Sequence, residues 1–406
     1  MSQGRKRIAV LGAGVMGCST ALFLARRGMA VTLFDSAEAP FSAASRWNEG
    51  KIHLGFLYSG DPSLRTAAHV AASSLHFRPL VEELLDCRID AAVTAGDEVY
   101  LCHRDSVVSV EAMGDYFRRV AALVREHPEA KSYLTNVSNC QTHRLTGVEL
   151  SAITNSTAIV AGFHAPERSV STTWIADRFV TAVAAENRIE ARMETRVVEV
   201  RPEHAGDTEG RWRVVATGGD DEAFDVVINV LWQGRPAIDA TAGLKPAGVW
   251  SNRYRLSLFA RMVEPVDIPC VVIATGPFGD IKNYNDRDFY MSWYQDGLRV
   301  YSAALSPPDP PPLDELERSR LCNSILDHLQ AIVPGVARTR SRIEHMSLEG
   351  GWVFAAGGGL LSDPRATLHR RSDFGITQLG SYFSVDTGKY AAAPWLAHRL
   401  ADRLSS

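Results

Sequence analysis

The sequence predicts an α/β protein in which a sheet of parallel strands is joined to a second region of antiparallel strands. Two observations carry this prediction. The chain opens with a strand, a glycine turn, a helix and a second strand between Arg7 and Asp35, which is the order of a doubly wound sheet. Residues 251–302 instead hold alternating, aromatic-rich strands separated by turn residues, as in an antiparallel meander. At 406 residues the chain exceeds one ordinary core, so we expect two or three domains.

The opening unit begins with residues 7–11, an apolar run that is typical of a strand buried on both faces. The turn from Gly12 to Gly17 then has the pattern G-x-G-x-x-G. The helix that follows ends at Arg26-Arg27-Gly28, where basic residues and a glycine favour termination. A second apolar strand, residues 30–34, leads directly to Asp35.

The residues of this unit have separate physical roles. Gly12 permits the tight turn, Gly14 lets the backbone approach a pyrophosphate, and Gly17 lets the helix lie close to the strand. Free N–H groups at the start of the helix favour the phosphate charge. Asp35 ends the second strand, where its carboxylate can accept hydrogen bonds from a ribose diol. The unit therefore predicts a dinucleotide site.

Composition excludes several other classes of protein. The net charge of −4 argues against a nucleic-acid surface. No apolar stretch approaches the roughly 20 residues of a membrane span, and the first apolar run is the nucleotide-binding strand rather than a signal peptide. The six cysteines are scattered, with no C-x-x-C, which indicates reduced thiols, no metal site and a cytoplasmic location.

The segment from Ser45 to Gly55 is dense in hydrogen-bonding side chains and is interrupted by glycines. Glycines let the backbone approach a flat ligand, so we interpret the segment as a cofactor contact; the alternative is a solvated loop. Helical patterns follow at residues 61–85 and 107–126, with a strand between them in 91–103.

The middle of the chain predicts a return to the first sheet. A helix over residues 171–186 precedes two short strands in 189–200 and further strands at 211–216 and 224–230. The last of these is strongly apolar and runs into Leu231-Trp232-Gln233-Gly234, a glycine turn. A strand leading to a second glycine turn is expected to lie beside the first strand.

The last part of the chain contains both patterns. After the meander come a proline-rich connector (307–312) and a helix over 313–332. A strand at 352–356 and another near 382–385 follow, and the latter leads into Asp386-Thr387-Gly388-Lys389-Tyr390. A final helix covers 394–404, and a glycine turn before a helix start again favours contact with phosphate or carbonyl oxygens.

Three segments together resemble the FAD-dependent oxidoreductases of the D-amino-acid oxidase type. The first is the opening unit. The second is Ser45 to Tyr58, whose pattern S-x-x-N-x-G-x-I-H-x-G-x-x-Y is similar to the flavin-contacting segment of L-2-hydroxyglutarate oxidases and glycerol-3-phosphate dehydrogenases. The third is Ser384 to Lys389, similar to the terminal glycine–lysine turn of glycerol-3-phosphate dehydrogenases. One departure is Leu231-Trp232-Gln233-Gly234, where the family usually has a small Ala-Gly sequence.

The resemblance implies a Rossmann-like FAD-binding domain built from three chain segments, plus an α+β substrate domain with an antiparallel sheet. We expect residues 1–90, 165–238 and 340–406 in the first domain, and residues 91–164 and 239–339 in the second. The FAD is expected to be non-covalent: no cysteine follows Cys322, which excludes the C-terminal cysteinyl attachment of sarcosine oxidases, and attachment through His53 is the alternative. The implied cofactor-binding residues are Gly12, Ala13, Gly14, Val15, Met16, Gly17, Asp35, Ser36, Ser45, Arg46, Asn48, His53, Val198, Trp232, Gly234, Thr387, Gly388, Lys389 and Tyr390.

The predicted activity is removal of a hydride from a C–H next to nitrogen or oxygen of a small polar amine, amino acid or hydroxy acid. His53 is the candidate base, since histidine titrates near neutral pH; the alternative is that it only bonds the flavin or the backbone. Lys389 is expected to stabilise charge on the reduced flavin, and Arg371, with Arg253, Arg255 and Arg370 as further candidates, to bind an anionic substrate.

Two other functions stay open from the sequence. One is an NAD-dependent dehydrogenase, because Asp35 also suits NAD. The other is a flavin-bearing protein with a non-catalytic binding role. The expected partners are a small-molecule substrate and an electron acceptor, either oxygen or another carrier, with no nucleic acid and no membrane span.

Overall fold

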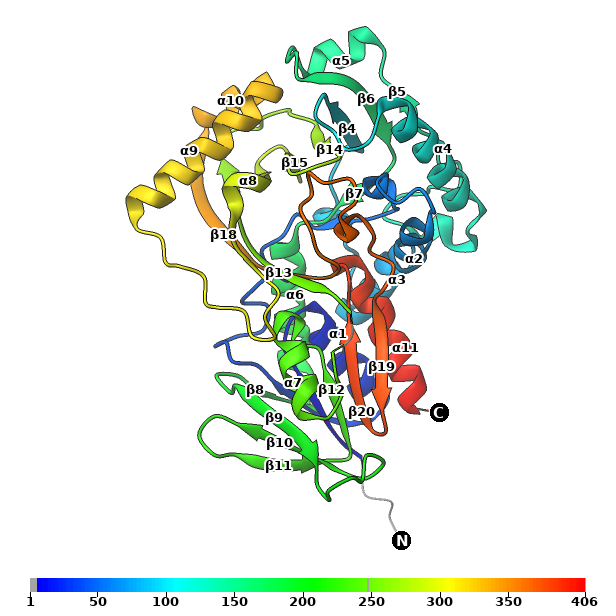
Figure 1. The fold of residues 1–406 in the computed structure, drawn as a ribbon, viewed down its shortest axis with the longest axis vertical. Helices are drawn as coiled ribbons and strands as arrows, with labels where there is room; N and C mark the ends of the chain where they lie inside the picture. Colours follow the sequence, from blue (N-terminus) through cyan, green and yellow to red (C-terminus); the bar gives the residue numbers. More distant parts are fainter. Residues whose placement is uncertain (1–5, 247, 406) are drawn as a thin grey trace.

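A six-stranded sheet lies at one end of the molecule in the computed structural model, which describes residues 6–246 and 248–405 (Figure 1). Its strand order is β19-β20-β12-β1-β2-β8. β1 lies between β2 and β12 and is parallel to both, and β20 is parallel to β12. This confirms the predicted return to the first sheet. The strands are β1 (Arg7–Leu11), β2 (Ala30–Phe34), β8 (Ile189–Arg192), β12 (Val226–Asn229), β19 (Gly375–Leu379) and β20 (Tyr382–Asp386).

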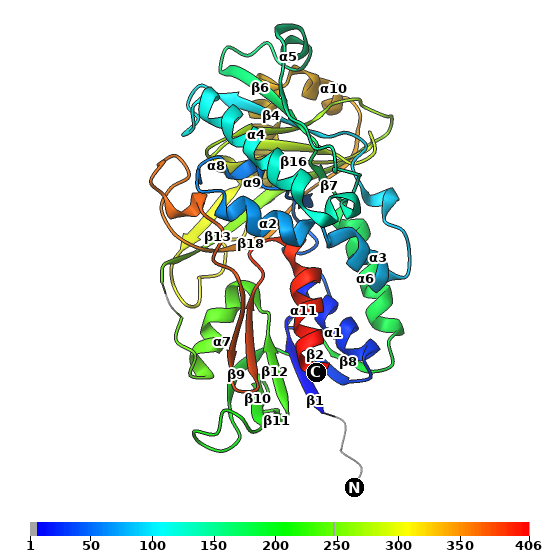
Figure 2. The same cartoon turned by 90° about the vertical axis from the view of Figure 1, so that its right-hand side faces the viewer.

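Helix α1 (Val15–Arg26) is buried nearly all round because other elements surround it. It contacts α11 (Ala393–Ser405) and α6 (Thr172–Ala185). Figure 2 shows α11 beside α1 over the sheet. Ala9 and Leu11 of β1 instead contribute to a core on the opposite face, formed with the three-stranded sheet β9 (Val197–Pro202), β10 (Trp212–Ala216) and β11 (Asp221–Phe224) and with α7 (Arg235–Thr241). The first sheet is thus covered on both faces, as its apolar strands predict.

A larger sheet forms the other end of the molecule. Its order is β17-β13-β16-β15-β14-β4-β6-β5, with β18 paired to β13. Its pairs are antiparallel except β14 with β4, which are parallel, so the predicted antiparallel sheet is confirmed with one parallel pair added. The strands are β4 (Glu98–His103), β5 (His143–Arg144), β6 (Ile159–Ala165), β13 (Trp250–Met262), β14 (Cys270–Ala274), β15 (Gly279–Asn283), β16 (Asp288–Trp293), β17 (Leu298–Ser302) and β18 (Ile343–Ala356).

Helices cover both faces of this larger sheet. Leu101 of β4 lies in a core with α9, while its neighbour Tyr100 lies in a core with α4, as expected when successive side chains of a strand point to opposite faces. The core around Tyr100 continues into that of α1 and α11, so the two domains share apolar packing. The remaining helices are α2 (Arg65–Ser74), α3 (Phe77–Leu85), α4 (Val110–Glu126), α5 (Gly147–Ile153), α8 (Tyr294–Gly297), α9 (Glu315–Ile332) and α10 (Ala337–Arg340).

Several predicted elements differ in their bounds. The helix predicted over 61–85 is two helices, α2 and α3, separated at Leu75-His76. Gly279 and Asp280, predicted as part of a turn, begin β15. The strand predicted at 352–356 begins already at Ile343, and β18 pairs with β13 along its length. The domain boundary that we placed at residue 340 therefore precedes a strand of the larger sheet.

Within the described ranges, no helix combines the length and apolar character that crossing a membrane requires.

Candidate active site

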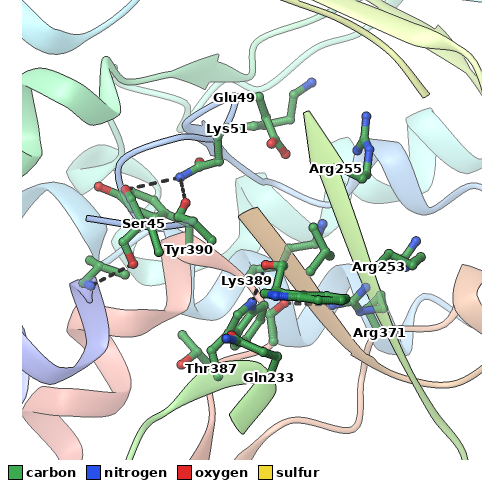
Figure 3. A pocket seen from close by; sticks show the side chains of 18 of the residues that line it. Ser45, Glu49, Lys51, Gln233, Arg253, Arg255, Arg371, Thr387, Lys389 and Tyr390 are labelled. Carbon is green, nitrogen blue, oxygen red and sulfur yellow. Dashed lines mark hydrogen bonds between the residues drawn. The ribbon is translucent and has the colours of Figure 1, made fainter. Parts of the chain in front are cut away.

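One cavity of about 520 Å³ connects the glycine turn of the smaller sheet with side chains of the larger sheet. Its lining includes Gly12 and Asp35 at the first sheet and Asp280 and Ser292 at the second. The three segments identified from the sequence all contribute to it, although they are far apart in the chain. Figure 3 shows the side chains that surround it.

The turn at the start of α1 leaves space and N–H groups for an anion. Gly14 is the residue before the helix and has no side chain of its own to cap the helix start. A Cβ on Gly14 would lie 2.7 Å from Oγ of Ser45, whose Oγ accepts a hydrogen bond from the backbone N–H of Val15 at 3.0 Å. A Cβ on Gly17 would overlap the carbonyl oxygen of Gly12. Glycines are therefore required here both by helix packing and by the cavity, as a pyrophosphate site demands.

Asp35 is fixed beside this turn at the end of β2. Its carboxylate accepts hydrogen bonds from the backbone N–H groups of Ala13 at 2.6 Å and Ala37 at 2.9 Å. Ser36 lines the cavity next to it. The carboxylate thus lies at the cavity wall in the place expected for a ribose partner.

The segment after Ser45 is held in an irregular conformation by its own side chains. Asn48 donates from Nδ2 to the carbonyl of Ala44 at 2.8 Å and accepts from the N–H of Gly50 at 2.9 Å. Gly50 has a φ of +65°, and a Cβ there would overlap the carbonyl of Val170. This arrangement presents Asn48, Glu49, Lys51 and His53 to the cavity.

The glycine–lysine turn after β20 forms a third part of the wall. Gly388 has a φ of +63°, its N–H bonds the carboxylate of Asp386 at 2.9 Å, and its carbonyl accepts from Nη2 of Arg371 at 2.9 Å. Arg371 is buried and also donates to the carbonyl of Phe354 at 3.0 Å. Both Arg371 and Lys389 line the cavity.

Lys389 is a half-buried cation near other cations. Burial, together with Arg371, lowers the pKa of Lys389 to about 7, against the raising effect of Glu49. Its Nζ lies 5.5 Å from the ring centre of Tyr58. A lysine held in this way is charged below about pH 7 and loses its charge above it.

Two arginines of β13 line a further part of the cavity. Arg253 and Arg255 lie two residues apart, which places them on the same face of the strand, and Figure 3 shows both along that strand. Nη1 of Arg253 donates to the hydroxyl of Tyr294 at 3.2 Å, and the guanidinium carbon of Arg255 lies 4.5 Å from the centre of the same ring. Within the part of the chain that the structure describes, the Nε atoms of both have no hydrogen-bond partner. Among the described residues, neither arginine has a carboxylate within ion-pair distance.

His53 is neutral in this environment. Burial, and next the charge of Lys389, lowers the pKa of His53 well below its ordinary value. Its Nε2 is 4.0 Å from Glu49, and its Nδ1 has no partner among the described residues.

Most of the predicted cofactor residues line the cavity, and four do not: Gly17, Arg46, Val198 and Gly234. Gly17 packs closely against the carbonyl group of Gly12 instead, which agrees with its predicted role in bringing the helix close to the strand. Arg46 points away and pairs with Asp177 at 2.6 Å. Val198 lies on β9 with 45% of its surface exposed. Trp232 lines the cavity, and its Nε1 donates to the carbonyl of Trp352 at 2.8 Å.

Sequence reasoning missed several charged or polar residues of the cavity wall, namely Glu49, Lys51, Gln233 and Asp280. Glu49 and Lys51 lie inside the segment predicted to contact the cofactor, so their charged side chains could have been predicted to face the cavity. Asp280 gave no such signal, because Gly-Asp is typical of an exposed turn.

Comparison with known proteins agrees with this geometry. The model of the FAD dependent oxidoreductase family matches residues 7–353. Among solved structures, glycine oxidase from Geobacillus kaustophilus is 16% identical, with a TM-score of 0.68 over 98% of this chain and 95% of that one. The L-proline dehydrogenase of P. horikoshii is 14% identical, with a TM-score of 0.65 over 99% and 92%. The FAD-bound L-alpha-glycerophosphate oxidase of Mycoplasma pneumoniae is 14% identical, with a TM-score of 0.65 over 99% and 95%.

The fold and the cavity define a Rossmann-type dinucleotide enzyme with a separate substrate sheet. The chain belongs to the FAD dependent oxidoreductase family, and FAD is its cofactor. The glycine turn, Asp35, the segment after Ser45 and the turn at Lys389 fit this cofactor, because they line one continuous cavity. Family membership selects the flavoenzyme over the nicotinamide-dependent alternative.

We expect heat or acid precipitation of the purified protein to release yellow FAD into the supernatant. The reason is that the described residues that line the cavity include no cysteine. The absorption spectrum of the supernatant measures the released flavin. Colour that stays with the precipitated chain would show covalent attachment instead.

Proposed function

We propose that this protein removes a hydride from a C–H bond next to nitrogen or oxygen of a small anionic substrate, either an amino acid or related amine or a hydroxy acid. The observation that carries the proposal is the pair Arg253 and Arg255 in the cavity wall: Arg253 is buried, Arg255 is half-buried, and the Nε atoms of both are buried without a hydrogen-bond partner among the described residues. A buried guanidinium without a carboxylate costs free energy unless a ligand supplies the anion.

Bound FAD supplies a two-electron acceptor. The protein supplies position and charge around it. Arg253 and Arg255 hold the anionic group of the substrate, and Tyr294 contacts both guanidinium groups, one through its hydroxyl and the other through its ring. A planar guanidinium can pair with a carboxylate or phosphate through two parallel hydrogen bonds, which orients the substrate as well as binding it. Lys389 and the N–H groups of its turn provide further positive charge in the same cavity.

Anaerobic mixing of the FAD-loaded protein with a panel of compounds tests this function. The panel contains amino acids, N-substituted amino acids, 2-hydroxy acids and glycerol 3-phosphate. We expect at least one class to bleach the flavin absorbance, and re-oxidation by oxygen or by a dye then identifies the acceptor. A flavin that dithionite reduces but no member of the panel reduces would contradict the proposal and favour a non-catalytic binding role.

Replacing Arg255 with Met should weaken binding of the anionic substrate at least about tenfold, because a charge-assisted hydrogen bond contributes about 1.5–3 kcal/mol. Flavin reduction at saturating substrate should change much less, since the arginine holds the bound and reacting states alike. Stopped-flow titration separates the two quantities. Arg261→Met is the matched control, because Arg261 lies on the same strand, is exposed and pairs with Asp288 at 3.0 Å. Equal effects of both substitutions would remove Arg255 from the binding site.

We also propose a division of the chain into domains that follows the sheets. The FAD-binding domain contains the opening segment, the segment around β8 to β12 and the part after β18, so its third segment begins near residue 357 rather than 340. The strand pairing of β18 with β13 supports this shift. A cytoplasmic location is proposed on the basis of six free cysteines.

A further inference from the structure

A chain of buried charges extends from the cavity wall to the segment after Ser45. We call it the buried charge chain; it consists of Asp280, Lys282, Glu98, Lys51 and Glu167. Nζ of Lys282 lies 3.6 Å from Asp280 and 2.8 Å from Glu98. Nζ of Lys51 lies 3.4 Å from both Glu98 and Glu167. Lys282, Glu98 and Glu167 are fully buried, and Lys51 is 3% exposed.

The two carboxylates at the inner end of the buried charge chain, Glu98 and Glu167, each accept hydrogen bonds in addition to their ion pairs with the lysines. Glu98 accepts from Oγ of Ser169 at 3.2 Å as well as from Lys282. Glu167 accepts from the hydroxyl of Tyr100 and from the backbone N–H of Leu54. Two carboxylates and two lysines therefore balance in charge, and Asp280 is the one further carboxylate of the buried charge chain.

Asp280 is also the member placed to exchange a proton with a ligand. It lines the cavity and keeps 18% of its side chain exposed there. Oγ of Ser292, on the paired strand β16, donates to Oδ1 of Asp280, and Ser292 in turn lies 3.5 Å from Nη2 of Arg255. The anion-binding arginine and the carboxylate are thus joined through one hydroxyl.

The other groups that face Asp280 fix how readily it takes up a proton. Burial, the largest effect, raises the pKa of Asp280, and Glu49 across the cavity raises it further. Lys282 on its own strand, Ser292 on β16 and Arg255 on β13 lower it, but the net pKa is above that of an ordinary aspartate. The hydroxyls of Tyr284 and Tyr290 remain protonated, because burial raises their pKa.

We propose that Asp280 is the proton acceptor of the reaction, taking the proton of the substrate's nitrogen or oxygen as the hydride leaves the adjacent carbon. This inference rests on the proposed function. The N–H or O–H bond breaks, its proton forms an O–H bond to the Asp280 carboxylate, and its electron pair completes the C=N or C=O bond. The electron pair of the C–H bond leaves with the hydride to the flavin. Negative charge gained by the flavin is then offset by the charge lost at Asp280.

This role differs from that expected of His53. The depressed pKa of the His53 ring makes it a weak proton acceptor, since a base is most effective when its pKa is near the working pH. We therefore infer that neutral His53 serves as a hydrogen-bonding group and that Asp280 receives the proton.

The pH dependence of the flavin midpoint potential tests the proposal without any substrate. If reduction drives proton uptake at Asp280, the wild-type potential falls more steeply with pH than that of Asp280→Asn. The wild-type slope should exceed the slope of the variant by up to about 30 mV per pH unit. One proton taken up with two electrons changes the equilibrium constant tenfold per pH unit, which corresponds to this potential. The comparison is repeated in the Lys389→Met background, because Lys389 also titrates near pH 7. Asp327→Asn, an exposed carboxylate of α9, is the control and should follow the wild-type curve.

Two further variants keep the test decisive if Asp280→Asn does not fold. Glu49→Gln removes a charge that raises the pKa of Asp280, so the steep part of the curve should move to lower pH. Ser292→Ala removes a bond that lowers this pKa, so the steep part should move to higher pH. Shifts in opposite directions support the assignment. Coincident curves for wild type and variants overturn it.

A reducing substrate from the panel adds a kinetic readout. Flavin reduction by the wild type should increase with pH as Asp280 ionises, and Asp280→Asn should be at least about a hundredfold slower with no such increase. A variant that only binds substrate less tightly, with an unchanged pH profile, would make Asp280 a binding group and overturn the proposal. If no compound of the panel reduces the flavin, the proposed function is wrong. The curves of midpoint potential against pH still show in that case whether Asp280 takes up a proton when the flavin is reduced.

Discussion

Gly14→Val should abolish FAD binding. The glycine precedes the first turn of α1, where a Cβ would lie 2.7 Å from Oγ of Ser45, and the two methyl groups of valine would extend into the cavity beyond it. That space is where the backbone must approach the pyrophosphate. The N–H groups of the helix start would also be covered, so the favourable charge interaction with the phosphates would be lost.

The flavin content of the purified variant, measured by absorbance, checks this expectation. Gly96→Val is the matched control: Gly96 is exposed, and a Cβ there would meet no atom within 4 Å. It should bind FAD in the wild-type ratio. Stoichiometric flavin in Gly14→Val would show that the pyrophosphate lies elsewhere.

Lys389→Met should retain FAD, lower its midpoint potential and slow its reduction by roughly tenfold or more, which corresponds to about 1.4 kcal/mol. Methionine keeps most of the length of the side chain and removes the charge. Hydride transfer adds negative charge to the flavin, and a fixed cation stabilises that charge more in the transition state than in the ground state. The measurement is a potential titration together with the rate of reduction under anaerobic conditions.

The effect of Lys389→Met should depend on pH with a defined sign. Because burial and Arg371 lower the pKa of Lys389 to about 7, the wild-type side chain is charged below this pH and neutral above it. The difference in potential between wild type and variant should thus be largest at acidic pH and shrink as the pH rises through 7. Lys389→Arg, which remains charged at all these pH values, should not show the decline. Identical potentials and rates in wild type and Lys389→Met would leave only the backbone N–H groups of the turn in this role.

The parts of the molecule that the sequence predicted well are those where local chemistry decides. The glycine turn, the apolar strand β2 and the Asp35 that ends it are constrained within one short unit, and all lie where their spacing indicated. The aromatic strands of the meander likewise follow from alternation alone. Gly388 illustrates the same point at the far end, since its φ of +63° is one that glycine adopts without cost.

The buried charge chain shows where such prediction ends. Lys282 contacts Glu98, which is 184 residues away in the chain, and each residue by itself is typical of a solvated surface. Nothing in the local sequence marks a lysine as fully buried. Lys282 lies on β15 and Glu98 on β4, and the two meet because β14 pairs with both of these strands. Contacts with distant parts of the chain also explain why residues 61–85, predicted as one helix, form the two helices α2 and α3. The apolar spacing of this segment is continuous, but the chain must turn at Leu75-His76 so that α3 can reach α1 and α11.

The assembly of the cofactor domain from distant segments has a consequence for its biosynthesis. Helix α1 is completed within the first 30 residues, whereas its partner α11 begins only at Ala393. At a synthesis rate of about 5–20 residues per second, roughly 20 to 70 s separate the two on the ribosome. During this interval the apolar surface of α1 that α11 will cover has no native partner, and β20 and Lys389 are made only at its very end. We therefore expect the nascent chain to depend on chaperones until its last helix emerges, and FAD to be captured only after that point.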